Sequence, residues 1–254
     1  MSRRGHRRLF SCMQERGRVM RLDDRLAAVA AFVPRGARVA DVGTDHAYLA
    51  IALVEERDAA HVIATDKNEG PCAAARRTLS AAGLSERVPV RCGDGLVPLS
   101  PGEVDTVCIA GMGGGLIASI LAAKPDVLRK LSRLVLQPMN DAPTLRRWLY
   151  ENGWHIAEEQ LSTADGRLYE IIAAEPGAED SPEPWLLTIG PVLWRKKPSL
   201  FARHIKAQIE RLRQILRGME KSETARGSDA YREIAAELRE IEGHWNDGEE
   251  NTHD

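Results

Sequence analysis

One apolar segment that ends in an acidic residue and a glycine constrains this chain more than any other feature. Residues 39–42 read Val-Ala-Asp-Val, Gly43 follows, and an apolar helical pattern starts near residue 47. This order predicts a β-strand that passes through a tight turn into the N-terminus of a helix. Backbone N–H groups point outward there, and a glycine lets a ligand approach the chain closely. Asp41 and Gly43 are therefore candidate ligand-binding residues.

A second apolar segment ends in an acid about 20 residues further along, the separation expected in doubly wound nucleotide-binding folds. Residues 62–65 are Val-Ile-Ala-Thr, and the next residue is Asp66. A carboxylate at the end of the second strand of such a fold commonly binds ribose hydroxyls. The two segments together predict an adenosine-containing cofactor with Asp66 at its ribose.

The order of strand-like and helical segments predicts an α/β fold. Strand and helix patterns alternate as far as residue 153, which is typical of a parallel sheet with helices on both faces. Residues 154–161 and 167–173 then flank an Ala-Asp-Gly turn, which predicts a closing antiparallel hairpin. Such a hairpin is typical of a Rossmann-like class I methyltransferase sheet and distinguishes it from a dehydrogenase sheet.

The C-terminal third has a different pattern. After a stretch rich in Pro, Gly and acids, apolar residues recur at steps of three and four in two segments joined by Arg-Gly-Ser. This predicts an antiparallel two-helix coiled-coil hairpin. The predicted organisation is a flexible Arg-rich arm (1–19), a cofactor-binding domain (20–176), a linker and packing segment (177–194), the helical hairpin (195–245) and a disordered tail (246–254).

Charge is unevenly distributed although the formal net charge is only −2. Residues 195–221 hold nine Lys and Arg against two Glu, and acids dominate from residue 229 onward. A basic segment beside an acidic one indicates either an anionic partner or two helices that attract each other. Arg195, Lys196 and Lys197 begin the basic segment and are candidate phosphate-binding residues.

The four cysteines lack CxxC spacing, and Cys92 and Cys108 fall in apolar strand segments. We therefore expect buried free thiols in a reducing cytoplasm. The histidines lack zinc-ligand spacing, so no metal is expected. No segment is long and apolar enough to cross a membrane, and the first residues lack an apolar stretch, so we expect no secretory signal. Two interpretations of the N-terminus remain open: an Arg-rich transit peptide, or a true start near Met20. The sequence also leaves the oligomeric state open.

The turn after the first strand also contains Asp45 and His46. It lacks the full G-x-G-x-x-G pattern that clamps a dinucleotide pyrophosphate. A cofactor without phosphates fits better, because a carboxylate can then meet an amino-acid group. S-adenosylmethionine carries an ammonium group that Asp41 or Asp45 could pair with.

Further candidates for cofactor binding lie at the ends of later strands. The carboxylate of Asp94, beside Gly95, could accept a hydrogen bond from an adenine amino group. A glycine-rich turn includes Gly111, Met112 and Gly113. Its backbone could contact a flat ligand closely, and the flexible methionine side chain could adapt to the surface of that ligand.

Candidates for substrate binding are amide and aromatic side chains. The amides of Gln137 and Asn140 could contact a base edge through paired donors and acceptors. Tyr48 and Tyr169 could stack on a nucleobase, whereas Trp148 shares a helical face with leucines and is more typical of a core residue.

These motifs together resemble the bacterial tRNA (adenine(22)-N1)-methyltransferase family over most of the chain, from about residue 22 to residue 245. The family pattern stands here as Asp-Val-Gly-Thr-Asp-His-Ala-Tyr-Leu at residues 41–49, Gly-Asp-Gly-Leu at 93–96, Ala-Gly-Met-Gly-Gly at 110–114, Leu-Gln-Pro at 136–138 and Ile-Gly-Pro at 189–191. Two positions depart from it: Ala50 replaces a proline, and Met139 replaces an asparagine, with Asn140 one residue later.

The resemblance implies a class I methyltransferase that uses S-adenosyl-L-methionine and methylates N1 of an adenine in the tRNA D-loop. Adenine N1 can attack the methyl group directly once it is held in line at about 3–3.5 Å. Asp45 is the candidate that stabilises the positive charge developing on the base, with His46 as its orienting partner. The helical hairpin would bind tRNA. The alternatives are a nicotinamide-dependent Rossmann oxidoreductase and a non-catalytic cofactor-binding RNA adaptor.

Overall fold

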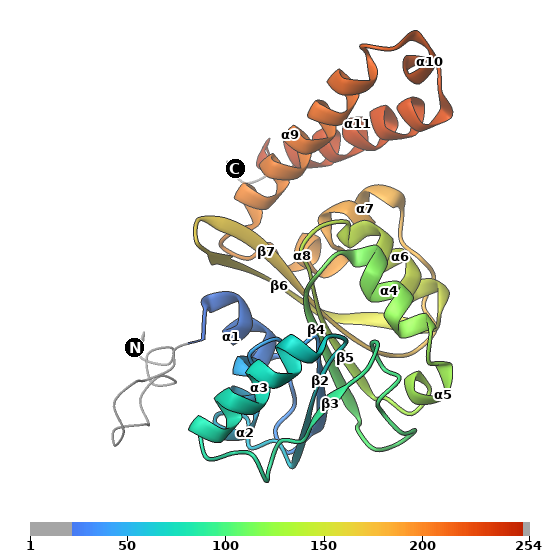
Figure 1. The fold of residues 1–254 in the computed structure, drawn as a ribbon. Helices are drawn as coiled ribbons and strands as arrows, with labels where there is room; N and C mark the ends of the chain where they lie inside the picture. The colour runs from blue at the N-terminus through green and yellow to red at the C-terminus, as the bar shows by residue number, and fades with distance from the viewer. Residues whose placement is uncertain (1–21, 251–254) are drawn as a thin grey trace, which may run out of the picture.

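The computed structural model describes residues 22–250 and has a seven-stranded sheet at its centre (Figure 1). The strand order is β3-β2-β1-β4-β5-β7-β6. Strands β1 to β5 run parallel, and β7 pairs antiparallel with both β5 and β6. The strands are β1 (Arg38–Val42), β2 (His61–Asp66), β3 (Val90–Cys92), β4 (Thr106–Met112), β5 (Arg133–Pro138), β6 (Trp154–Ala164) and β7 (Arg167–Pro176). The predicted parallel sheet with a closing antiparallel hairpin is confirmed.

Helices cover both faces of this sheet (Figure 1). Helices α1 (Asp24–Ala31), α2 (Tyr48–Glu55) and α3 (Glu69–Ala81) share one apolar core with the sheet, and α4 (Gly114–Ala122), α5 (Pro125–Leu128) and α6 (Ala142–Glu151) share the other. Successive residues of β1 alternate between the two cores: Val39 packs with α1–α3, and Ala40 packs with α4–α6. Apolar residues at both kinds of position explain why the strands read as continuous apolar segments.

The region predicted as a linker contains two short helices. They are α7 (Pro184–Ile189) and α8 (Pro191–Lys196), each six residues long with a proline at its first position. A proline is well suited to that position because its missing N–H would have no partner within the helix. Six residues are too few to show the helical periodicity of apolar residues clearly, so the sequence predicts only a linker and packing segment here.

The C-terminal hairpin is an antiparallel pair of long helices that extends beyond the sheet (Figure 1). Its helices are α9 (Phe201–Met219) and α11 (Asp229–Glu250), with the short α10 (Glu223–Arg226) between them. The pair shares an apolar core with β6, α7 and α8, separate from the two cores of the sheet; its α9 and α11 members include Ile205, Leu212 and Ile241. Helix α11 continues to Glu250, so the predicted disordered tail is wrong for residues 246–250; the predicted N-terminal arm lies outside the described residues.

A buried ion cluster joins the base of the hairpin to the sheet. The guanidinium of Arg146 is fully buried and donates to Glu159 at 2.7 Å, to Glu170 and to the carbonyl of Leu187 at 2.8 Å. Glu159 also accepts hydrogen bonds from the first backbone N–H groups of α8, at 2.8 and 3.2 Å. Every charged member therefore has a hydrogen-bonding partner, as burial of a charge requires.

Candidate active site

A cavity of about 570 Å³ lies where the carboxyl ends of β1, β2, β3 and β4 meet. In open α/β sheets this edge is the usual ligand-binding position. The cavity brings together ten of the residues singled out in the sequence, from four separate segments of the chain. They are Asp41, Gly43, Asp45, His46, Tyr48, Asp66, Asp94, Gly95, Gly111 and Met112.

Asp41 lies at the floor of this cavity. Its side chain is buried, and one carboxylate oxygen accepts a hydrogen bond of 2.6 Å from the hydroxyl of Thr44. Burial raises the pKa of Asp41 from 3.8 to about 6, although the bond from Thr44 works in the opposite direction. The carboxylate therefore gains most from a cationic ligand, because such a ligand would offset the cost of holding its charge.

The turn after β1 is tightly held against the end of β2. The N–H groups of Gly43 and Thr44 both donate to the carbonyl of Thr65, at 2.8 and 3.0 Å. Asp45 and Ala47 adopt left-handed backbone conformations with φ of 50° and 60°, and α2 starts directly afterwards. Among the described residues, the buried hydroxyl of Thr65 has no hydrogen-bonding partner, and this residue lines the cavity.

Asp66 and Asp94 lie on neighbouring loops. The Asp66 carboxylate accepts from the backbone N–H groups of Asn68 at 3.0 Å and Asp45 at 3.4 Å, which links the turns after β1 and β2. Asp94 pairs with Lys67 at 2.8 Å, and both side chains are exposed. The N–H of Gly93 donates to the carbonyl of Asp66 at 2.9 Å, so the two acids are held side by side.

Asp45, His46 and Tyr48 form an exposed rim. His46 Nε2 lies 3.8 Å from a carboxylate oxygen of Asp45, and the His46 ring stacks on Tyr48 with centroids 5.5 Å apart and planes at 14°. The Tyr48 side chain is 39% exposed. This rim offers a carboxylate and a flat aromatic surface to a ligand that enters from solvent.

The glycine-rich turn after β4 faces the loop after β5. Gly111 has a φ of 80°, and the carbonyl of Met112 accepts a 2.8 Å hydrogen bond from the N–H of Met139. A Cβ on Gly113 would lie 2.8 Å from the amide oxygen of Asn140, so the Asn140 side chain lies close against the backbone of this turn. Gly113 and Asn140 lie next to the cavity wall and are not among its lining residues.

Gln137 does not match its predicted role in reading a base. Its side chain is fully buried: Oε1 accepts from the N–H of Gly111 at 3.1 Å and from Arg25 Nη1 at 2.9 Å, while Nε2 donates to the carbonyl of Pro138 at 2.7 Å. With these contacts made, Gln137 positions its neighbours. Asn140, which is exposed, is the amide that remains available to a ligand.

Arg25 is a cavity residue that the sequence did not indicate. It lies in the first turn of α1, and its guanidinium reaches the ends of β4 and β5 and lies 5.8 Å from the ring centre of Tyr169. Tyr169 itself does not line the cavity. No local spacing could identify Arg25, because its contacts are made with residues more than 80 positions away.

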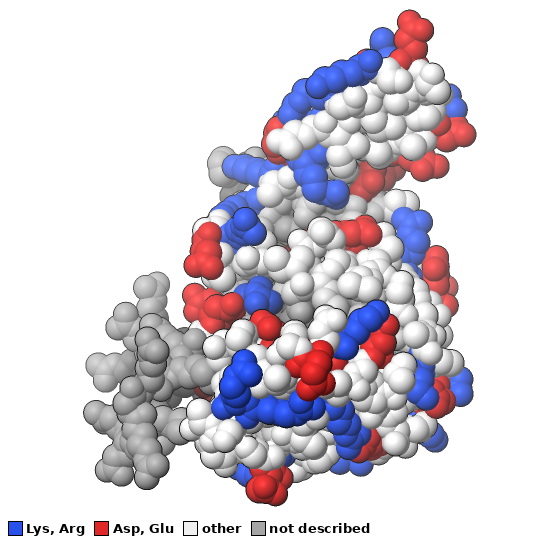
Figure 2. Space-filling view, in the orientation of Figure 1, with Lys and Arg blue, Asp and Glu red and all other residues white. Residues whose placement is uncertain are grey.

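The basic residues Arg195, Lys196 and Lys197 are exposed at the end of α8 and do not line the cavity. The ammonium of Lys197 lies 5.2 Å from the ring centre of Trp194. Figure 2 shows Lys and Arg gathered along the α9 side of the hairpin and acids on its α11 side. Arg213 pairs with Glu242 at 2.6 Å, so the two helices also attract each other across the hairpin.

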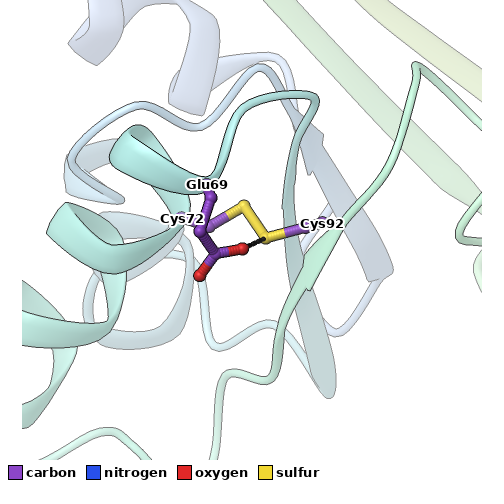
Figure 3. Close-up of side chains that lie close together, drawn as sticks. All are labelled: Glu69, Cys72 and Cys92. Carbon is purple, nitrogen blue, oxygen red and sulfur yellow. Dashed lines mark hydrogen bonds between the residues drawn. A yellow bond between two sulfur atoms is a disulfide. The ribbon is translucent and has the colours of Figure 1, made fainter.

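The cysteines correct another prediction. Cys72, at the start of α3, and Cys92, at the end of β3, form a disulfide with Cα atoms 6.2 Å apart (Figure 3). Cys92 is exposed, so it is neither free nor buried, whereas Cys108 is both. The spacing gave no signal because the two residues meet only when the sheet forms. Glu69 Oε2 lies 3.0 Å from the Cys92 sulfur, but the two bonded sulfurs are not thiolate ligands for a metal.

None of the described helices is both long and apolar enough to cross a membrane.

The family profile described as "Methyltransferase domain" matches residues 22–172. A Bacillus subtilis protein named tRNA (adenine(22)-N(1))-methyltransferase is 35% identical over 222 residues, covering 85% of this chain and 93% of that protein. The chain belongs to the tRNA (adenine(22)-N1)-methyltransferase family.

Two solved structures agree with this assignment. The B. subtilis m1A22 tRNA methyltransferase is similar at a TM-score of 0.78 and 34% identity, covering 87% of this chain and 98% of that one. A Streptococcus pneumoniae structure solved in complex with S-adenosyl-L-methionine has a TM-score of 0.77 at 33% identity and covers 87% of this chain and 99% of its own. The predicted family resemblance is confirmed, and it favours the methyltransferase over the oxidoreductase interpretation.

Proposed function

We propose that this protein transfers the methyl group of S-adenosyl-L-methionine to N1 of adenine 22 in tRNA. The observation that carries the proposal is the single cavity that joins the turn after β1 to the glycine-rich turn after β4, in a chain of this family. The first turn carries the candidate cofactor residues, and the second lies where an acceptor base could reach them. A tRNA substrate would place this activity in the cytoplasm.

The residues of the cavity fit this cofactor. It is lined by four carboxylates, from Asp41, Asp45, Asp66 and Asp94, and by two cationic side chains. This excess of negative charge suits a ligand that carries an ammonium and a sulfonium group. The partnerless hydroxyl of Thr65 and the close backbone at Gly43 leave polar contacts for it.

Each acid has a proposed role. Asp66 would accept hydrogen bonds from the ribose hydroxyls, Asp94 from the adenine amino group, and Asp41 or Asp45 would pair with the ammonium. When bound, the cofactor supplies an electrophilic methyl group. Gly95, Gly111 and Met112 would hold its flat parts through the backbone and through van der Waals contact.

On the acceptor side, the protein has to hold an adenine with N1 aimed into the cavity. N1 lies on the Watson–Crick edge, so the base must be unpaired or extruded. Tyr48 and Tyr169 would stack on the extruded nucleotide, and Asn140 would contact a base edge. Positive charge grows on the base as N1 is alkylated, and the exposed Asp45 carboxylate, with His46 beside it, would stabilise that charge. The α9 side of the hairpin, together with residues 195–197, would bind the tRNA backbone.

The deciding experiment is mass-spectrometric mapping of the modified nucleoside in tRNA from a strain that lacks this modification. We expect 1-methyladenosine at position 22, and none in a transcript with guanosine at that position. Methylation at another base would refute the site, and absence of any methylation would support an RNA adaptor without catalysis.

A second measurement tests the catalytic role of Asp45. If Asp41 pairs with the ammonium of the cofactor, the variant Asp45→Asn should bind S-adenosylhomocysteine as the native enzyme does and should lose most of its turnover. Calorimetric titration with S-adenosylhomocysteine and with NAD separates the methyltransferase from the oxidoreductase interpretation, because only the expected cofactor product should bind.

A further inference from the structure

The acceptor side of the cavity contains a cationic side chain with no role in the scheme above. Arg25 Nη1 donates to Gln137 Oε1 at 2.9 Å and would lie 3.6 Å from a Cβ on Gly111. The guanidinium also lies 5.8 Å from the ring centre of Tyr169. It is thus fixed at the ends of β4 and β5, the side of the cavity away from Asp66 and Asp94.

The charge of Arg25 is only partly compensated. Its ion-pair partner among the described residues is Asp23, at 3.5 Å, and the Asp23 carboxylate already accepts the helix-capping bond from the N–H of Leu26 at 2.7 Å. The other cationic lining residue, Lys67, pairs with Asp94 at 2.8 Å. Arg25 lines the cavity, and its side chain is 19% exposed. Nη1 has one protein acceptor in Gln137 and Nη2 has one in Asp23, so further N–H groups remain for a ligand.

We propose that Arg25 binds a backbone phosphate next to the target adenosine and so anchors the extruded nucleotide at the cavity mouth. This inference rests on the proposed function. A phosphate matches this guanidinium because the N–H groups left over by Gln137 and Asp23 can donate to its oxygens. The carboxylate of the cofactor would match them as well, and the S-adenosylhomocysteine affinity of an Arg25 variant separates the two.

The base itself is a poorer partner for Arg25. Methylation at N1 places positive charge on the adenine ring, and a cation beside that ring would oppose the reaction. A phosphate carries a full negative charge throughout and lies at the edge of an extruded nucleotide. The hydrogen bond to Gln137 holds the guanidinium in place before the RNA arrives.

The test compares Arg25→Gln, Arg25→Lys and the control Arg35→Gln. Arg35 is an exposed residue that pairs with Asp58. It lies near the amino end of β1, whereas the cavity lies at the carboxyl ends of the strands, so Arg35→Gln removes one positive charge at a site far from the cavity. The affinity for tRNA is measured against salt concentration with S-adenosylhomocysteine present, and the affinity for S-adenosylhomocysteine is measured separately.

We expect Arg25→Gln to weaken tRNA binding about tenfold or more. The slope of log affinity against log salt should fall by about 0.7–0.9, the loss of one phosphate contact. Arg25→Lys should keep the slope, and the control should match the native protein. S-adenosylhomocysteine affinity should be equal in all four proteins. An unchanged slope, or a loss of S-adenosylhomocysteine affinity in Arg25→Gln, would overturn the proposal, because either would mean that Arg25 only supports the strand ends.

A D-arm RNA with one neutral methylphosphonate linkage identifies the phosphate. When the methylphosphonate replaces the phosphate on one side of the target adenosine, the native protein should bind this RNA more weakly than the unmodified RNA. The Arg25→Gln variant should bind the two RNAs equally well. If Arg25→Gln lost further RNA affinity when the linkage on either side of the target adenosine was neutralised, the proposal would be overturned. Failure of the native protein to methylate unmodified tRNA would instead refute the proposed function, so the two failures are distinguishable.

Discussion

The side chain of Met112 lies directly over Gly43: a Cβ built on Gly43 would lie 2.2 Å from the terminal methyl carbon of Met112. Gly43 directly follows β1 and Met112 ends the neighbouring strand β4, so this contact joins the turn after β1 to the glycine-rich turn after β4 across the cavity. Gly43 also has a φ of 77°, which side chains rarely adopt.

The contact predicts a large effect for Gly43→Ala. A suitable control is Gly36→Ala, because Gly36 has a φ of 73° and nothing within 4 Å of its Cβ position. The control should lower the free energy of unfolding by about 1 kcal/mol, the cost of the backbone conformation. Gly43→Ala should cost about 0.5–1.5 kcal/mol more, the cost of pushing the flexible Met112 side chain off its rotamer. Urea denaturation measures this, and adding Met112→Ala should recover part of that excess. Equal effects of the two glycine variants would show that Met112 moves aside freely.

The raised pKa of Asp41 predicts a pH-dependent stability. Folding raises this pKa from 3.8 to about 6, so the folded protein holds a proton that the unfolded chain loses in this range. The free energy of unfolding should therefore fall by about 3 kcal/mol as pH rises from about 4 to about 6. Chemical denaturation of native protein and Asp41→Asn over this range should show the decline only in the native protein.

Protonation of Asp41 at low pH, which stabilises the folded protein, should weaken cofactor binding. If the ionised Asp41 pairs with the ammonium, S-adenosylhomocysteine should bind about tenfold more weakly at pH 5 than at pH 7, because most of the carboxyl is then protonated. The Asp41→Asn variant should bind weakly at both values. A pH-independent affinity in the native protein would assign the ammonium to Asp45.

Asp66 is expected to contribute to affinity more than to stability. Replacing it by asparagine keeps its shape and removes the charge that two ribose hydroxyls would face, so S-adenosylhomocysteine should bind about 1–3 kcal/mol more weakly. Asp58→Asn, an exposed acid that pairs with Arg35, is the matched control. Isothermal titration of both variants checks this, and equal affinities would exclude the ribose contact.

The exposed cations at the end of α8 predict a separate effect. The double variant Arg195→Gln and Lys196→Gln should raise the KM for tRNA and leave kcat and S-adenosylhomocysteine affinity unchanged, because neither residue lines the cavity. Steady-state kinetics with tRNA from the unmodified strain checks this. An unchanged KM would move the tRNA contact to other parts of the hairpin.

The disulfide predicts a reductant-sensitive stability. Cys72 and Cys92 close a loop with a sequence separation of 20, and removing such a link costs about 3 kcal/mol in the chain-entropy account. Reduction should therefore lower the melting temperature of the native protein and leave Cys92→Ser unaffected. Alkylation of the denatured protein should label Cys108 without reductant but Cys72 and Cys92 only after reduction. Labelling of all three without reductant would contradict the pairing.

Much of the cavity could be predicted because the sheet itself assembles it. Asp41, Asp66 and Asp94 each lie at or just after the carboxyl end of a parallel strand, and parallel strands place these ends along one edge, so local spacing was sufficient. Arg25, Gln137 and the cysteine pair were different. Arg25 and Gln137 are 112 residues apart, and their hydrogen bond exists only after α1 has packed on the sheet. Local patterns carry no information on such contacts, and the same reason explains why Gln137 looked like a surface amide.

The fully paired Arg146 determines how far the hairpin can move. Moving α7 and α8 away from the sheet would leave the Arg146–Glu159 pair in place but remove the two backbone donors of Glu159 and the carbonyl of Leu187 that accepts from Arg146. Each lost hydrogen bond to a buried charge costs about 1.5–3 kcal/mol. Thermal motion rarely supplies that much. Helices α7 and α8 are thus held on the sheet, and α9 and α11 share an apolar core with them, which sets the distance between the hairpin and the cavity. An RNA that contacts both must match that distance.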